Sequence, residues 1–155
     1  EGPMSWWRKL ISGNSEDGLR ETDYYGEGTD LLRQEKYHEA LTSFRLALRE
    51  DPSDTDVLQQ IAVTYTHIGM TDEAVRTYRR VLDMKPHASG AHYGLAFLLL
   101  QRGSMDDGIA HLRAFLAHPP HIAEATRHIE HARAKLAELT GEVDEVLPEM
   151  PPENG

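Results

Sequence analysis

Histidine and acidic side chains on one predicted helix are the first candidates for chemistry. Glu124, His128 and His131 follow one another at intervals of four and three residues, so they share a helix face. Imidazole and carboxylate groups bind zinc or nickel, and the chain has nine histidines, of which three more lie nearby: His111, His118 and His121. The paired-histidine motif of zinc enzymes is missing, and single histidines are common on solvated faces. We therefore predict no metal site.

The motifs that catalysis requires are missing from the sequence. The chain has no cysteine, which excludes cysteine nucleophiles, disulfides and thiolate metal sites. It also has no glycine-rich phosphate loop, no Gly-x-Ser-x-Gly turn, and no carboxylate pair on a recognisable scaffold. We predict a protein that is not an enzyme and needs no cofactor.

The charge and the apolar runs exclude two other classes of protein. The 155 residues carry a formal net charge of −10, and the 16 lysines and arginines are scattered. Nucleic acid is therefore not expected as a partner, because phosphates require clustered basic residues. The longest apolar run, Leu95–Leu100, is far shorter than the roughly 18 residues that span a bilayer. We expect one domain in a cytoplasmic protein, with association to a membrane surface left open.

Residues 1–20 contain both tryptophans and have three possible roles. Glu1-Gly2-Pro3 resembles the remnant of an expression tag, and residues 12–18 have the composition of a flexible linker. The segment could cover the first helix pair. It could also insert shallowly at a membrane surface, where its tryptophans and its two basic residues are favoured, or dock into a second copy or another partner. In each case the contact residues would be Trp6, Trp7, Leu10 and Ile11.

The elements that would position the remaining side chains repeat every 34 residues. Pro52, Pro86 and Pro120 have this spacing. Apolar positions in each unit recur at i, i+1, i+4, i+7 and i+8, which places them on one helix face. A second set upstream has helical spacing too, so each unit predicts two helices. Three of the aligned columns are Ala40/Ala74/Gly108, Phe44/Tyr78/Leu112 and Leu48/Leu82/Leu116.

The residues between the predicted helices agree with this division. Gly69 and Gly103 fall between the two helices of their units, where a left-handed residue ends a helix at little cost. The first unit has Glu35 at that position. A proline closes each unit, because it disfavours helix at the residue before it.

These features resemble the tetratricopeptide repeat, a helix-turn-helix of 34 residues with small, aromatic and proline residues at set positions. The resemblance covers residues 21–54, 55–88 and 89–122. It implies an all-α, right-handed solenoid. Glu27, His92 and Gly108 depart from the pattern without breaking the fold. Pentatricopeptide repeats, which bind RNA and have a usual period of 35, fit less well.

The ends of the array have a distinct composition. Residues 123–140 predict a helix that caps the last repeat, with an apolar stripe made by Ala125, Ile129, Ala132 and Leu136. Residues 141–155 are acidic and contain prolines, so we expect them to be disordered. An alternative is that residues 147–152 form a short docking motif extended by its prolines.

The resemblance also implies which side chains face the concave groove of such an array. We expect Tyr25, Tyr93 and Phe97 to anchor a partner, although Tyr93 and Phe97 could instead be core residues. Gly90 and Gly94 are expected to lower the wall of the groove and admit a bulky side chain. The basic clamp that co-chaperone members use for a C-terminal carboxylate is missing. The full set of expected groove residues is Tyr25, Thr29, Arg33, Gln59, Val63, His67, Tyr93, Phe97 and Gln101.

From these observations we predict a non-catalytic adaptor that binds an extended or helical segment of a partner protein in its groove. Two alternatives remain open. In one, the chain is a homo-oligomeric assembly module that uses the tryptophan segment or the capping helix. In the other, it is recruited to a membrane surface.

Overall fold

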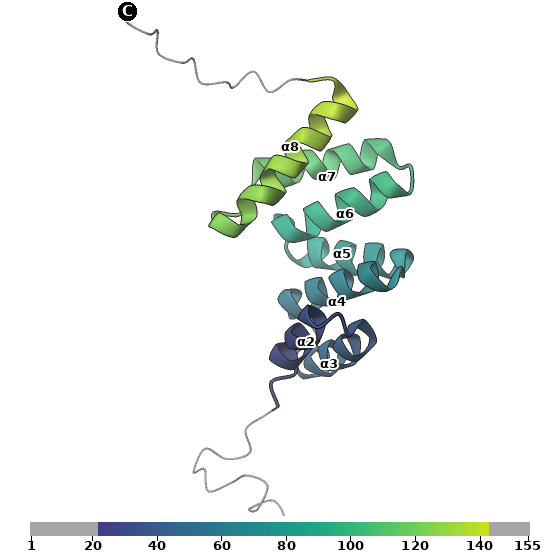
Figure 1. Cartoon of the computed structure of the whole chain (residues 1–155), viewed down its shortest axis with the longest axis vertical. Helices are drawn as coiled ribbons and strands as arrows, with labels where there is room; N and C mark the ends of the chain where they lie inside the picture. The colour runs from purple at the N-terminus through teal and green to yellow at the C-terminus, as the bar shows by residue number, and fades with distance from the viewer. Residues whose placement is uncertain (1–21, 143–155) are drawn as a thin grey trace, which may run out of the picture.

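The computed structural model describes residues 22–142, and these contain seven α-helices and no strand. The helices follow one another in antiparallel pairs along the stack in Figure 1. A short 3-10 turn, η1, precedes the last helix. In chain order the elements are α2 (Tyr24–Arg33), α3 (Tyr37–Glu50), α4 (Thr55–Ile68), α5 (Thr71–Met84), α6 (Ser89–Gln101), α7 (Met105–Ala117), η1 (Ala123–Ala125) and α8 (Thr126–Thr140).

Local sequence signals account for the helix ends. The Asp54 carboxylate accepts hydrogen bonds from two backbone amides at the start of α4, those of Asp56 at 3.0 Å and Val57 at 3.2 Å. Gly69 ends α4 with a φ of 87°, as expected for a left-handed residue. Glu35 has a φ of 60°, so the first unit makes the same turn with a residue other than glycine.

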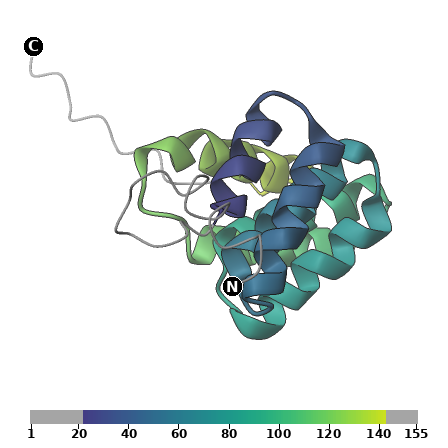
Figure 2. The same ribbon diagram turned by 90° about the horizontal axis from the view of Figure 1, so that it is seen from below.

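Each helix packs against the next one along the chain, and the first helices of neighbouring pairs also touch. This arrangement places α2, α4 and α6 side by side along one face of the stack. Viewed along the stack, the pairs wind around a common axis (Figure 2). The predicted all-α, right-handed solenoid is therefore confirmed.

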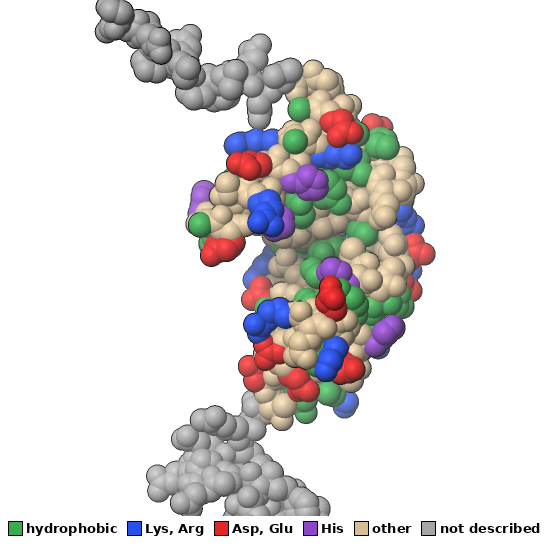
Figure 3. Space-filling model, viewed as in Figure 1, with side chains coloured by type: hydrophobic (Ala, Val, Ile, Leu, Met, Phe, Trp, Pro, Cys, Tyr) green, Lys and Arg blue, Asp and Glu red, His purple; other side chains and the backbone are tan. Residues whose placement is uncertain are grey.

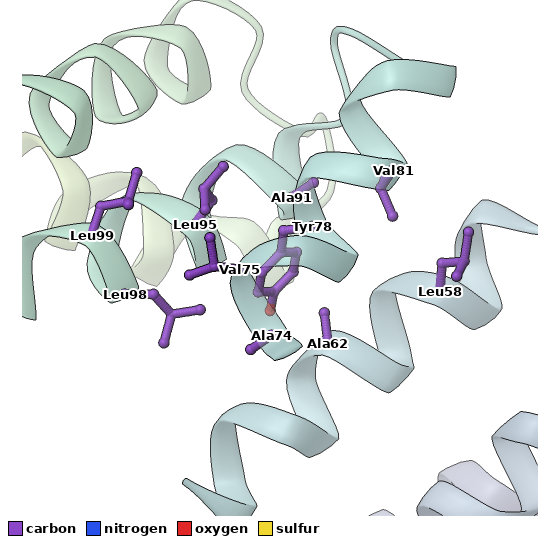
Figure 4. Close-up of a cluster of buried hydrophobic side chains, with 10 residues drawn as sticks. All are labelled: Leu58, Ala62, Ala74, Val75, Tyr78, Val81, Ala91, Leu95, Leu98 and Leu99. Atoms are coloured by element: carbon purple, nitrogen blue, oxygen red, sulfur yellow. The ribbon is translucent and has the colours of Figure 1, made fainter. Parts of the chain in front are cut away.

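The small and aromatic columns of the repeat form the core. Ala40 and Ala74 are completely buried, and Gly108 occupies the same position in the third unit against Leu100. The middle of the stack is filled by a cluster around Tyr78 (Figure 4). Leu48 packs against both this cluster and the one in the first unit. The apolar positions thus join neighbouring repeats into a continuous core.

The capping helix α8 closes the stack as its apolar stripe predicts. Ala132 is completely buried, while Ile129 and Leu136 are half-buried against α7 and α6 side chains. The helix begins at Thr126 instead of Ala123, because residues 123–125 form η1. Among residues 22–142, no helix is both long enough and apolar enough to cross a bilayer.

Candidate groove between α4, α6 and α8

The concave face of the stack contains a hollow of about 800 Å³. Helices α4, α6 and α8 supply most of its lining, and the side chain of Tyr78 reaches it from α5. Apolar and histidine side chains surround the recess in Figure 3, where it opens to solvent between α8 and the lower helices. Pockets of this size and apolar character are typical of ligand sites.

Tyr78 forms part of the floor of this hollow. Its side chain is 4% exposed, and burial raises its pKa to about 12, against the opposing effect of a hydrogen bond with the Thr66 side chain. A methyl group at Gly94 would overlap the Tyr78 ring and hydroxyl, and one at Gly90 would lie 2.5 Å from the Gln59 Oε1 atom. The expectation that Gly94 leaves room for a partner side chain is therefore wrong, because Tyr78 of the same chain fills that room.

Tyr93 and Phe97 form an aromatic wall that belongs both to the groove and to the core. Both side chains are half-buried and line the hollow, and their ring centroids lie 4.8 Å apart. The Tyr93 ring also lies 5.1 Å from that of Phe115, which is 2% exposed. Burial raises the pKa of Tyr93. Both rings therefore pack against the core and also line the hollow, and their role as anchors for a partner stays a prediction.

Two histidines of the capping helix complete this wall. The His131 ring stacks on Phe97 with centroids 4.6 Å apart and planes 5° from parallel, and its Nδ1 atom lies 2.8 Å from the Tyr93 hydroxyl. The His128 ring meets Tyr93 edge-on at 5.0 Å. Within residues 22–142, no group of three or more histidine, aspartate or glutamate side chains is arranged to hold a metal ion. The histidine face of α8 contacts aromatic rings instead.

The hollow contains five of the nine expected groove residues: Val63, His67, Tyr93, Phe97 and Gln101. The other four lie outside its lining. Tyr25 packs 6.1 Å from the Phe44 ring, Thr29 donates a hydrogen bond to the Gly26 carbonyl, and Arg33 pairs with Asp30 on α2. Gln59 lies beside Gly90 at the edge. The tryptophan segment with Trp6, Trp7, Leu10 and Ile11 lies outside the described residues.

The sequence did not indicate that α8 lines the groove. Lys135 and Leu139 face the hollow, and so does Met105 at the start of α7. Lys135 lies outside the apolar stripe that was predicted for this helix. The spacing of the histidines on α8 was the signal in the sequence that could have indicated it. This spacing placed them on one face of the helix, but it did not show which helix that face contacts.

The helix pairs and the groove can be compared with known proteins. The model of the family described as tetratricopeptide repeat matches residues 31–82 and 69–136, which together cover most of the chain. The chain belongs to the tetratricopeptide repeat family. The match of the family model confirms the resemblance that the repeats indicate.

Proteins similar to this tetratricopeptide repeat chain include chaperone components. A tetratricopeptide repeat and J domain-containing co-chaperone, DNJ1 of Fusarium oxysporum, is 36% identical over 78 residues, which are 50% of this chain and 15% of that protein. Hsp70-Hsp90 organizing protein 1 of Glycine max is 24% identical over 98 residues, covering 63% of this chain and 17% of the relative. The chain therefore spans only a small part of these curated relatives.

A solved structure shows the same fold over most of its length. The type III secretion chaperone SycD of Yersinia enterocolitica, in complex with a peptide of the translocator YopD, superimposes with a TM-score of 0.69. The match covers 75% of this chain and 88% of that chain at 17% sequence identity. The likeness shows that the arrangement of helix pairs is shared.

Proposed function

We propose that this chain is a non-catalytic adaptor that binds a segment of a partner protein in the groove between α4, α6 and α8. The observation that carries the proposal is the apolar hollow of about 800 Å³ with the half-buried wall of Tyr93 and Phe97. Aromatic side chains with a polar edge supply much of the energy at recognition surfaces. The complex of SycD with a translocator peptide supports this use of the fold.

Met105 provides a test that spares the core. Its side chain is 47% exposed and lines the groove at the first residue of α7. Met105→Glu would place a charge in the hollow and should abolish partner capture. Met70→Glu is a matched control, because Met70 is 36% exposed at the N-cap of α5 and is not among the residues that line the groove. Both substitutions put an acid at a helix N-terminus, where it is tolerated.

The measurement is a quantitative pull-down with the wild type and the two variants. Proteins held by the groove are retained by the wild type and Met70→Glu and lost with Met105→Glu, while circular dichroism remains unchanged. Retention of the same proteins by all three forms would contradict the proposal. Alanine at Tyr93 and Phe97 is a poorer test, since Tyr93 also packs on Phe115.

The remaining parts of the interpretation are proposals of the same kind. The cytoplasmic location is a proposal with which the lack of cysteine is compatible. Cell fractionation tests it. A role of Trp6 and Trp7 in oligomer formation or at a membrane surface concerns residues outside 22–142. Light scattering of a variant lacking residues 4–18 tests the role in oligomer formation. Liposome flotation of the chain with Trp6→Ala and Trp7→Ala tests the role at a membrane surface.

A further inference from the structure

The groove has an uneven charge environment. Among residues 22–142, the ionisable side chains that line it, apart from the two tyrosines, are His67, His128 and Lys135, and no aspartate or glutamate of this range takes part. Lys135 pairs with Glu138 at 3.4 Å, but the Glu138 side chain is 68% exposed, so this pair contributes little and can exchange. Acidic side chains gather at the α2 and α3 end of the stack, and others lie on the α8 part of the molecule (Figure 3).

Residues 143–155 have a complementary composition. They contain four acidic residues and no lysine or arginine, at Asp144, Glu145, Glu149 and Glu153. Next to the acids lie apolar residues that could contact the aromatic wall: Val143, Val146, Leu147 and Met150. The tryptophan segment is a poorer match, since its Arg8 and Lys9 would find no acidic partner in the lining.

The segment begins after Glu142, which pairs with Arg113 of α7 at 3.5 Å. Leu139 lines the hollow, and α8 ends at Thr140. The thirteen residues that follow Glu142 can reach about 43 Å when extended, at about 3.3 Å per residue. Crossing from α8 over α6 to α4 requires about 20 Å at helix spacings of about 8–10 Å. The segment is therefore long enough to lie along the whole groove.

Attachment makes even weak contacts effective. A short flexible tether gives an effective concentration in the millimolar range. A segment whose free peptide binds with a Kd of about 1 mM would therefore fill the groove about half of the time. We propose that residues 143–155 bind in the groove of their own chain, so that a partner must displace them. This proposal rests on the groove being the binding site.

The absence of cysteine allows the proposal to be tested on the full chain. A nitroxide attached at Asn154→Cys has a unique position, because no other cysteine exists. Amide signals of groove residues such as Val63, His67 and Gln101 should lose at least half of their intensity. Signals of exposed residues on the other helices of the pairs, such as Thr42 and Arg76, should keep theirs. Reduction of the nitroxide gives the reference intensities.

Two controls make the test specific. Charge reversal with Asp144→Lys and Glu149→Lys should restore the groove signals, and so should an excess of a synthetic peptide of residues 143–155. The proposal is overturned if the loss is confined to the ends of α7 and α8, or if neither control restores intensity. It is also overturned if the effect disappears on dilution, since that assigns the contact to a second copy.

This result can be separated from the test of the groove itself. Loss of partner capture in Met105→Glu without nitroxide contact would leave the proposed function and remove the internal ligand. Nitroxide contact without loss of partner capture would leave the binding of residues 143–155 in the groove, but it would remove the proposed function and with it the displacement by a partner.

Discussion

Replacing Gly94 by alanine tests whether Tyr78 forms the floor of the groove. In a helix interior this change alone should stabilise the fold by about 1 kcal/mol. The added methyl group, however, would overlap the Tyr78 hydroxyl and lie 2.8 Å from its Cε2 atom. Overpacking of this kind costs about 1–3 kcal/mol, and displacing the ring would lose the hydrogen bond with Thr66, worth about 1 kcal/mol. We expect a net loss of about 1–3 kcal/mol.

Thermal and urea unfolding followed by circular dichroism measure this loss. At about 4 °C per kcal/mol, Gly94→Ala should lower the melting temperature by about 4–12 °C. Gly90→Ala is the control on the same helix, because its methyl group would meet only the flexible end of Gln59. That variant should match or exceed the wild type in stability.

A double-mutant cycle identifies the cause. Combining Gly94→Ala with Tyr78→Leu removes the ring that the methyl group would strike, so the two changes should couple by about 1 kcal/mol or more. Equal stability of Gly94→Ala and Gly90→Ala, or purely additive effects in the cycle, would refute the filled floor.

Two further predictions concern pH and capping. The His92 and His111 Nδ1 atoms lie 3.0 Å apart, and burial together with His92 and Arg79 lowers the pKa of His111, while Asp107 opposes this. The unfolded chain then binds the proton first, so stability is lost as the pH falls below about 6.5. Melting temperatures between neutral and mildly acidic pH should fall more in the wild type than in His111→Gln, and equal slopes would count against this. Asp54→Ala should cost about 1 kcal/mol in urea unfolding by removing the α4 cap. Ser104→Ala should cost less, because Ser104 makes no side-chain cap bond, and similar losses would contradict the capping argument.

The helix pairs could be predicted from the sequence because their signals are local. The 34-residue period, the apolar spacing within each unit and the glycines at 69 and 103 each act within one or two turns of the chain. Glu35 shows the limit of this reasoning, since it adopts the left-handed conformation with a φ of 60° although its side chain does not favour it. The repeat imposes the turn on that residue.

The groove was less predictable because it depends on contacts distant in the sequence. Tyr93 and His131 are 38 residues apart, and only the folded chain brings their side chains within 2.8 Å. Helical spacing showed that His128 and His131 share a face, but it could not show that the face meets aromatic rings. Likewise, the small size of Gly94 was visible, but the Tyr78 ring that uses the space was not.

The position of α6 between two core clusters has a consequence for synthesis of the chain. Leu95 and Leu99 belong to the cluster around Tyr78, whereas Ala96 and Leu100 belong to the cluster shared with α7 and α8. While the protein emerges from the ribosome, α6 can bury its first side against finished repeats, but its second side is covered first by α7, through Leu112 and Phe115, and completely only once Ala132 of α8 has been made. Nascent chains therefore pass through a stage with an exposed apolar helix, which is where aggregation or chaperone capture would act.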